Sequence, residues 1–305
     1  MNKNIFCFPG YTKKAFTFTI DDGNLPLDKK FIDIVKPAGI KGTFNLVGAD
    51  RQGRLTDEEY HEFYRGFEIA DHCKSHPKVI LPTDNYVISD DAFDPQTANG
   101  EYIYKTEREG VYRKKFVSWW GCVATTDAYI KLIDDGKAEL DAIFGKENVR
   151  DFVWPYHEQD DDKIKEHLRA AGYRSVRKTG TAGFDMPTDR MAWCYNAVHT
   201  NLCERAAEYE ALSDDGSLKF FCFGLHSHDY ENNNCWDVLQ TLADKYGNRP
   251  DDFWYATVGE IFDYEDAVNA ATVTDGKIKN NSDITVYMIV DGKRVALAPG
   301  EEFKV

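Results

Sequence analysis

Short apolar runs alternate with amphipathic segments of helical period up to about residue 270. Residues 15–20 are Ala-Phe-Thr-Phe-Thr-Ile, a composition typical of a buried strand. Apolar side chains then recur at helical spacing from Leu27 to Val35, and residues 41–47 fit a second strand. A strand, a helix and a strand in this order predict parallel strands joined by a right-handed crossover.

The same alternation continues along the chain. Further helices are expected over 56–64, 126–144, 161–171, 204–212, 236–246 and 258–270, and further strands over 66–70, 152–154, 173–177, 191–198, 219–225 and 253–257. From about residue 272 the apolar period changes to two, and Asp291-Gly292 between two such runs predicts a β-hairpin. These patterns predict an α/β fold with a parallel sheet and a small C-terminal β appendage.

One stretch interrupts this rhythm and guides the division into domains. Residues 82–122 are rich in Asp, Tyr and Trp, and so long a segment is uncommon unless it is functional. Its aromatic residues would suit a sugar-stacking surface, or they would pack the insertion onto the body. We therefore expect a body over residues 1–271 with an insertion at about 82–122, followed by a β extension over 272–305.

Composition narrows the possible partners and setting. The 305 residues carry a formal net charge of −15 without a long Lys/Arg block, so nucleic acid and membranes are not expected partners. No apolar run approaches the ~18 residues of a membrane span, and the N-terminus has no signal-like apolar segment. The seven cysteines form no Cys-x-x-Cys pair. A cytoplasmic location with reduced thiols is expected, and a homo-oligomer remains open.

Candidate chemistry follows four of the predicted strands. The groups at the strand ends are Asp21-Asp22, His72 with His76, Pro155-Tyr156, and His226 with His228. If the parallel sheet curls into a barrel, all four groups meet at one edge. A helical turn would point the imidazoles of His72 and His76 the same way.

Two histidines and one carboxylate are a typical set of ligands for a divalent metal ion. Zn²⁺ is the first expectation, with Co²⁺, Ni²⁺ or Fe²⁺ as alternatives. The pair is not the His-Glu-x-x-His motif of zinc proteases, because Cys73 stands where the glutamate would be. A polar Asp-Gly turn and a surface pair of histidines would produce the same residues, so spacing alone leaves the metal site open.

The motifs together resemble the polysaccharide deacetylases, the nodulation-deacetylase-like carbohydrate esterases of family four. Residues 18–23, Phe-Thr-Ile-Asp-Asp-Gly, are similar to the first family motif, and residues 72–76, His-Cys-Lys-Ser-His, to the second. Residues 154–156, Trp-Pro-Tyr, resemble the third motif in a variant branch that lacks its arginine. Residues 223–227, Phe-Gly-Leu-His-Ser, resemble the fifth. The resemblance extends from about residue 5 to 270 and implies a distorted (β/α) barrel of about seven strands.

The resemblance also implies roles for residues of this chain. Asp22, His72 and His76 would hold one divalent metal ion. Asp21 would be the general base, and His226 would be the general acid.

Further residues are expected around this centre. The resemblance implies that the backbone N–H of Tyr156 helps bind the oxyanion, and Trp154, Pro155, Tyr156 and His228 are expected to contact substrate. Arg177, at the end of the next strand, is a candidate to replace the missing motif arginine, with an ordinary surface salt bridge as the alternative.

We therefore expect a metal-dependent hydrolase that removes N- or O-acetyl groups from a sugar or oligosaccharide. Two alternatives remain: a C–N hydrolase acting on a linear amide that is not a sugar, and a carbohydrate-binding barrel without turnover. The missing arginine keeps the last alternative open.

Overall fold

The structure of the protein is a computed structural model, and it describes residues 5–48, 55–79, 87–88, 101–106, 110–115, 122–123, 126–156, 161–274 and 276–304. Most of the expected insertion at about 82–122 lies outside these residues. Within it, β7 (Glu101–Thr106) and β8 (Gly110–Lys115) pair as an antiparallel hairpin. None of the helices in the described ranges is long and apolar enough to cross a membrane.

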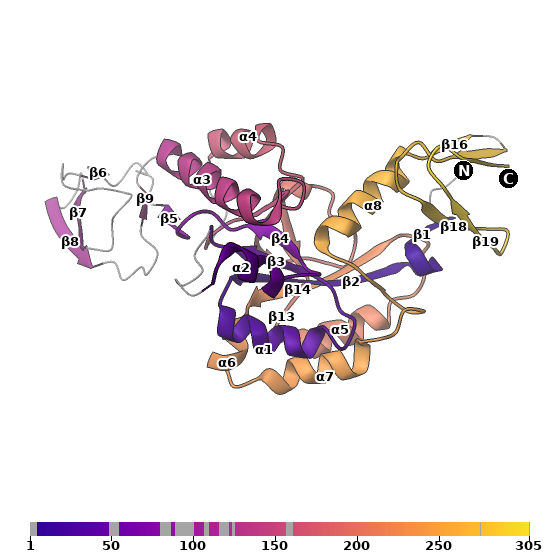
Figure 1. Cartoon of the computed structure of the whole chain (residues 1–305), viewed down its shortest axis with the longest axis horizontal. Helices are drawn as coiled ribbons and strands as arrows, with labels where there is room; N and C mark the ends of the chain where they lie inside the picture. Colours follow the sequence, from indigo (N-terminus) through magenta and orange to yellow (C-terminus); the bar gives the residue numbers. More distant parts are fainter. Residues whose placement is uncertain are drawn as a thin grey trace.

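A parallel sheet forms the centre of the molecule (Figure 1). Its strands are β2 (Lys14–Asp22), β3 (Thr43–Leu46), β4 (Glu68–Asp71), β10 (Asp151–Val153), β11 (Ser175–Thr181), β12 (Trp193–Tyr195), β13 (Ala197–Val198), β14 (Lys219–His226) and β15 (Trp254–Tyr255). Their order is β12-β11-β10-β4-β3-β2-β14-β13, and β15 pairs with β2 alone. The expected last strand at 253–257 is thus a two-residue pairing beside the start of β2.

One short segment lies at both edges of this sheet and closes it. Trp193 pairs with Arg177 of β11, whereas Ala197, four residues later, pairs with Phe223 of β14. Asn196 joins the two halves, because its backbone N–H donates to the Cys222 carbonyl and its side-chain oxygen accepts from the Cys222 N–H. The expected distorted (β/α) barrel is therefore confirmed, with the segment 193–198 as its closing strand.

Helices surround the sheet. They are α1 (Leu25–Val35), α2 (Asp57–Phe63), α3 (Thr126–Phe144), α4 (Asp162–Ala170), α5 (Leu202–Glu210), α6 (Ser227–Asn232), α7 (Trp236–Tyr246) and α8 (Val258–Ala270). In Figure 1, α3 and α4 lie on one side of the sheet, and α1, α5, α6 and α7 lie on the other. The expected capping box of Thr56 and Glu59 begins α2. Helix α6, directly after β14, was not predicted.

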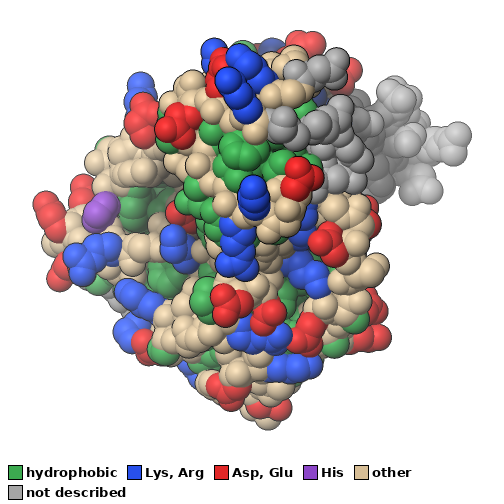
Figure 2. Space-filling view, turned by 90° about the vertical axis from the view of Figure 1, so that its right-hand side faces the viewer, with side chains coloured by type: hydrophobic (Ala, Val, Ile, Leu, Met, Phe, Trp, Pro, Cys, Tyr) green, Lys and Arg blue, Asp and Glu red, His purple; other side chains and the backbone are tan. Residues whose placement is uncertain are grey.

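The C-terminal strands form two small antiparallel sheets. One contains β16 (Thr272–Thr274), β17 (Lys277–Lys279) and β20 (Glu302–Lys304). The other contains β1 (Phe6–Cys7), β18 (Val286–Val290) and β19 (Lys293–Leu297), so a strand from the N-terminal end joins the predicted hairpin. On the face that carries these sheets, acidic and basic side chains are interspersed, so the net negative charge does not dominate this face (Figure 2).

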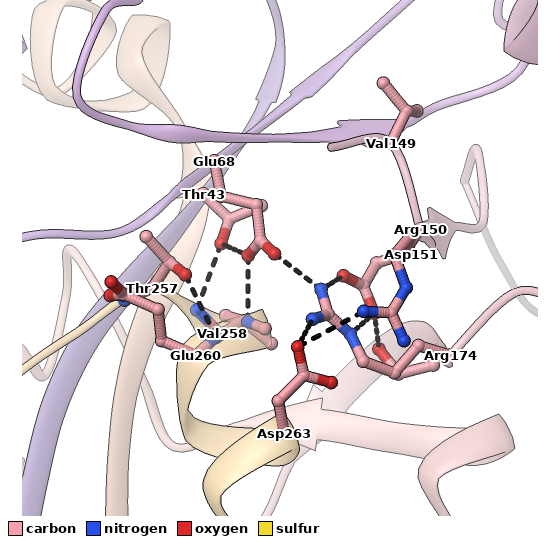
Figure 3. Close-up of polar contacts among 12 residues, drawn as sticks. Thr43, Glu68, Val149, Arg150, Asp151, Arg174, Thr257, Val258, Glu260 and Asp263 are labelled. Carbon is pink, nitrogen blue, oxygen red and sulfur yellow. Dashed lines mark hydrogen bonds and ion pairs between the residues drawn. The ribbon is translucent and has the colours of Figure 1, made fainter. Parts of the chain in front are cut away.

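A buried ion network ties together the amino ends of the central strands (Figure 3). Arg174, just before β11, bonds both oxygens of Asp151, the first residue of β10. It also bonds Glu68, the first residue of β4, and Asp263 of α8, the latter at 2.8 Å. Glu68 in turn accepts from the Gly259 backbone N–H in the first turn of α8, at 2.9 Å. This network anchors α8 and holds that end of the barrel closed.

Candidate active site

The pairing of the central strands brings the predicted residues together at the carboxyl edge of the sheet. β2 and β14 pair along their length, and this register aligns Asp21 with His226. His72 follows β4, two strands from β2 in the sheet. As a result, Asp22 Oδ1 lies 3.5 Å from His72 Nε2 and 3.5 Å from His76 Nε2.

The segment that carries the two histidines is not the helical turn that the spacing predicted. Cys73, Ser75 and His76 all have positive φ angles, of 64°, 62° and 40°. The Cys73 N–H donates to Asp71 Oδ1 at 2.8 Å, and the Lys74 N–H donates to the Leu132 carbonyl of α3 at 3.0 Å. A tight loop stabilised by these bonds, rather than a helix, brings both imidazoles to Asp22.

The hydrogen bond of His72 fixes which of its nitrogens faces Asp22. Its Nδ1 lies 2.9 Å from the carbonyl oxygen of Val153. Because a carbonyl only accepts, Nδ1 carries a proton, and Nε2 is the nitrogen that faces Asp22. Support of this kind from a backbone carbonyl is typical of histidines that bind metals.

Asp22, His72 and His76 fit a divalent metal ion. Asp22 Oδ1 is buried and has no hydrogen-bond partner among the described residues. Two ligands of a tetrahedral Zn²⁺ stand about 3.4 Å apart, which agrees with the separations of 3.5 Å observed here.

Ionisation favours the same set of ligands. Burial opposes the charge on Asp22, but the surrounding imidazoles hold its pKa well below its usual range. Burial, reinforced by His72, lowers the pKa of His76 to about 3. A carboxylate and a neutral imidazole are the forms that a metal ion requires.

The neighbouring Asp21 has a different environment. The Arg177 guanidinium donates to both of its oxygens, and Asn45 Nδ2 donates to Oδ1 at 2.6 Å. Burial raises the pKa of Asp21, but the charge of Arg177 outweighs this and holds it below its usual range. Arg177 is 2% exposed, so the contact is a buried pair and not the surface salt bridge considered as the alternative.

His226 is paired on the side away from Asp22. Its Nδ1 donates to Asp229 Oδ2 at 3.0 Å, and its Nε2 lies 3.7 Å from Asp22 Oδ2. Burial lowers the pKa of His226, but the bond to Asp229 and the charge of Asp21 and Asp22 raise it to about 9. The sequence analysis did not identify Asp229, although its position three residues after His226 is that of a capping box.

His228 stacks on His226, with ring centroids 4.4 Å apart and an interplanar angle of 20°. Its Nδ1 lies 4.0 Å from Asp22 Oδ2, so Asp22, His226 and His228 form a second possible group of ligands. The lone pairs of stacked imidazoles lie in nearly parallel planes and do not converge on one ion. His72 and His76, whose rings meet at 67°, suit a single ion better.

The predicted substrate contacts separate into exposed and buried residues. Tyr156 is 37% exposed, has a φ of 60°, and lies with its ring 4.6 Å from that of His76. By contrast, Trp154 is 3% exposed and stacks on Tyr129 of α3, and Pro155 is also buried. Trp154 packs in the core and Pro155 is buried, so both offer little surface to a sugar, and their contact with substrate stays a prediction.

Backbone strain gathers around these residues. Of the ten residues other than glycine with positive φ in the described ranges, six lie at this edge: Asp22, Cys73, Ser75, His76, Tyr156 and Leu225. Such conformations cost about 1–3 kcal/mol each, persist only where the surrounding structure holds them, and cluster at active sites and ligand-binding sites.

The fold and this constellation define a (β/α) barrel that gathers carboxylates and imidazoles at its carboxyl edge. Residues 10–176, more than half of the chain, match the model of the polysaccharide deacetylase family. The chain belongs to this family. No curated protein matches it.

One solved structure supports the fold, and two others are similar over most of their length. A protein from Mycobacterium smegmatis assigned to the polysaccharide deacetylases has a TM-score of 0.52 at 15% identity, over 88% of this chain and 96% of that one. A family 4 acetyl xylan esterase from Clostridium thermocellum, solved with a cobalt ion, has a TM-score of 0.43 at 16% identity, over 82% and 90%. A family 4 carbohydrate esterase from Bacillus anthracis has a TM-score of 0.45 at 14% identity, over 85% and 87%.

Proposed function

We propose that the protein is a metal-dependent hydrolase that removes N- or O-acetyl groups from a carbohydrate. Asp22, His72 and His76 would hold one divalent ion, Zn²⁺ first and Co²⁺, Ni²⁺ or Fe²⁺ as alternatives. The observation that carries the proposal is the contrast between two adjacent carboxylates. Within the described residues, Asp22 Oδ1 has no hydrogen-bond partner and lies between two imidazole nitrogens, whereas both oxygens of Asp21 are bonded by Arg177.

Asp21 is the proposed general base. A bound divalent ion supplies Lewis acidity, which polarises the acetyl carbonyl and makes water more acidic. Arg177 keeps Asp21 ionised, and Arg177 together with Asn45 fixes the direction of its carboxylate. An ionised, oriented carboxylate beside the ligand Asp22 can take a proton from the attacking water.

His226 is the proposed general acid. A pKa of about 9 leaves the imidazole protonated at neutral pH. Asp229 bonds its Nδ1, so the proton on Nε2 is directed toward Asp22 and the reacting group. The leaving amine or alcohol of the sugar would receive this proton.

Tyr156 and His228 are the proposed substrate contacts. The exposed ring of Tyr156 beside His76 offers an aromatic surface to a sugar, and its left-handed backbone turns the peptide at this point. We assign the Tyr156 N–H to the developing oxyanion. His228, about one-third exposed beside His226, lies on the leaving-group side.

The test is acetate release from N-acetylated and O-acetylated oligosaccharides, including peptidoglycan fragments and acetylated xylan. Protein stripped with chelator should be inactive and should recover activity with Zn²⁺ or Co²⁺. Release that persists after complete stripping would contradict the metal dependence. Sugar binding without release from any acetylated substrate, in metal-loaded protein, would favour a binding barrel instead.

A further inference from the structure

A glycine stands in the middle of α3, against the loop that carries His72 and His76. The buried side of α3 contains Tyr129, Ile133, Leu140 and Phe144, and Gly136 continues this stripe at helical spacing. Glycine is the least favourable residue in a helix interior after proline. An apolar side chain would be expected at this position, so the glycine requires a structural reason.

The reason is the close approach of the loop backbone. A Cβ atom on Gly136 would lie 2.7 Å from the Lys74 nitrogen and 3.0 Å from the carbonyl carbon of Cys73. It would also lie 3.0 Å from Asp71 Oδ1, the atom that accepts from the Cys73 N–H. Two of these atoms belong to the backbone, so the loop itself would have to move.

Three further residues hold the loop 72–76 against α3. The Leu132 carbonyl, one turn before Gly136, accepts from the Lys74 N–H. Tyr173 donates its hydroxyl proton to Asp71 Oδ2 at 2.6 Å, which fixes the carboxylate whose other oxygen holds Cys73. We call Asp71, Leu132, Gly136 and Tyr173 the loop seat.

The loop cannot shift without turning the proposed ligands. Cys73, Ser75 and His76 are all left-handed, so few alternative backbone paths join His72 to His76. A displacement at Lys74 would therefore change the separations of 3.5 Å between Asp22 and the two imidazoles.

We propose that the loop seat sets the metal affinity of the site, with Gly136 as a positioning residue for His72 and His76. This inference rests on the proposed function, because it assumes that the two histidines bind a metal ion. It assigns a role in that site to α3, whose own residues supply none of the proposed ligands.

The test compares Gly136→Ala with wild type and with Ala138→Gly. Ala138 lies exposed on the same helix, so its change weakens the helix without touching the loop. Zn²⁺ affinity is measured by chelator competition, and the visible spectrum of bound Co²⁺ reports ligand geometry. Loss of support for metal ligands typically weakens binding about 10–100-fold. We expect a loss of this size and an altered Co²⁺ spectrum for Gly136→Ala, with both unchanged for Ala138→Gly.

A second variant decides the outcome if Gly136→Ala does not fold. Tyr173→Phe keeps the ring and removes only the hydroxyl that holds Asp71, and it should weaken Zn²⁺ binding several-fold. A folded Gly136→Ala with the affinity and spectrum of wild type would overturn the loop seat, as would an unchanged Tyr173→Phe if the glycine variant is unfolded. Wild type without Zn²⁺ or Co²⁺ binding would instead overturn the proposed function, and this inference with it.

Discussion

The two ends of the barrel use the same residue types for different purposes. Arg174 and Arg177 stand three residues apart, and each pairs with a buried aspartate, Asp151 at the amino end and Asp21 at the carboxyl end. At the amino end, Arg174 and Ser175 bond the oxygens of Asp151. At the carboxyl end, Asp22 Oδ1 finds no hydrogen-bond partner in the part of the chain that the structure describes. At the amino end the buried ion pairs stabilise the fold. At the carboxyl end the oxygen of Asp22 remains available to bind a metal ion.

The two ends of the barrel also differ in what a helical glycine allows to approach the helix. Gly259 of α8 leaves room for Arg174 and Glu68 at the amino end, and Gly136 of α3 leaves room for the backbone around Lys74 at the carboxyl end. The first glycine allows ion pairs to close the barrel. The second allows a strained loop to approach Asp22. Changes at the two ends should therefore separate stability from activity.

The largest effect is expected from the adjacent acids at the carboxyl end. Asp22→Ala should lose both metal and activity, because it removes a ligand. Asp21→Asn should keep the metal and lose about 10²–10⁴-fold in kcat/KM, the usual contribution of a general base. Metal content and acetate release, measured on the same samples, check both. If Asp21→Asn lost the metal while Asp22→Ala kept both metal and activity, the two roles would be reversed.

The next effect concerns stability and belongs to the amino end. Arg174→Met leaves Glu68 and Asp151 buried without their cation, which should cost about 3–5 kcal/mol of unfolding free energy in urea. Arg150→Met is the matched control, because Arg150 is only partly buried and its Nη1 lies 3.3 Å from Asp263 Oδ2. It should cost at most about 1 kcal/mol. If Arg174→Met altered metal affinity in the folded protein, the two ends would not be separable.

A pH profile tests the pairing of His226. Its pKa is raised to about 9, so the acid form is present below that pH and is lost as the pH rises through it. Asp229→Asn removes the partner that raises this pKa, so the alkaline limb of kcat/KM should move to lower pH. Glu231→Gln, an exposed change on the same helix, should leave the limb unmoved. If the alkaline limb of kcat/KM did not move in Asp229→Asn, His226 would not be the general acid.

The smallest effect is a helix cap at the amino end. Thr257 Oγ1 accepts from the Glu260 N–H at the start of α8. Thr257→Ala should lower the unfolding free energy by about 1 kcal/mol, measured by urea unfolding, with kcat/KM unchanged. A lower kcat/KM in the folded variant would show that α8 also supports the site.

Local periodicity predicted much of the fold. The expected helices at 126–144 and 258–270 coincide with α3 and α8, and Asp291-Gly292 forms the turn between β18 and β19. Apolar spacing and turn residues are properties of neighbouring positions, so a sequence displays them directly. The closing strand 193–198 was predicted only as a strand, because its role depends on pairing with two distant partners.

The candidate site was predicted less completely. Strand ends identified the residues that gather around Asp22, but the left-handed loop after His72 depends on contacts with α3 that no local pattern displays. Asn45 and Asp229 were missed because each acts through a partner. The burial of Trp154 was not apparent from the sequence either, because a motif does not indicate which residues face the core.

Metal content of the purified protein tests the central claim most directly. Elemental mass spectrometry should find roughly one divalent ion per wild-type chain, as expected for one set of three ligands. The double variant His72→Ala/His76→Ala should contain none. Absence of metal in wild type, even after reconstitution with Zn²⁺, Co²⁺ and Ni²⁺, would contradict the account and favour a binding barrel.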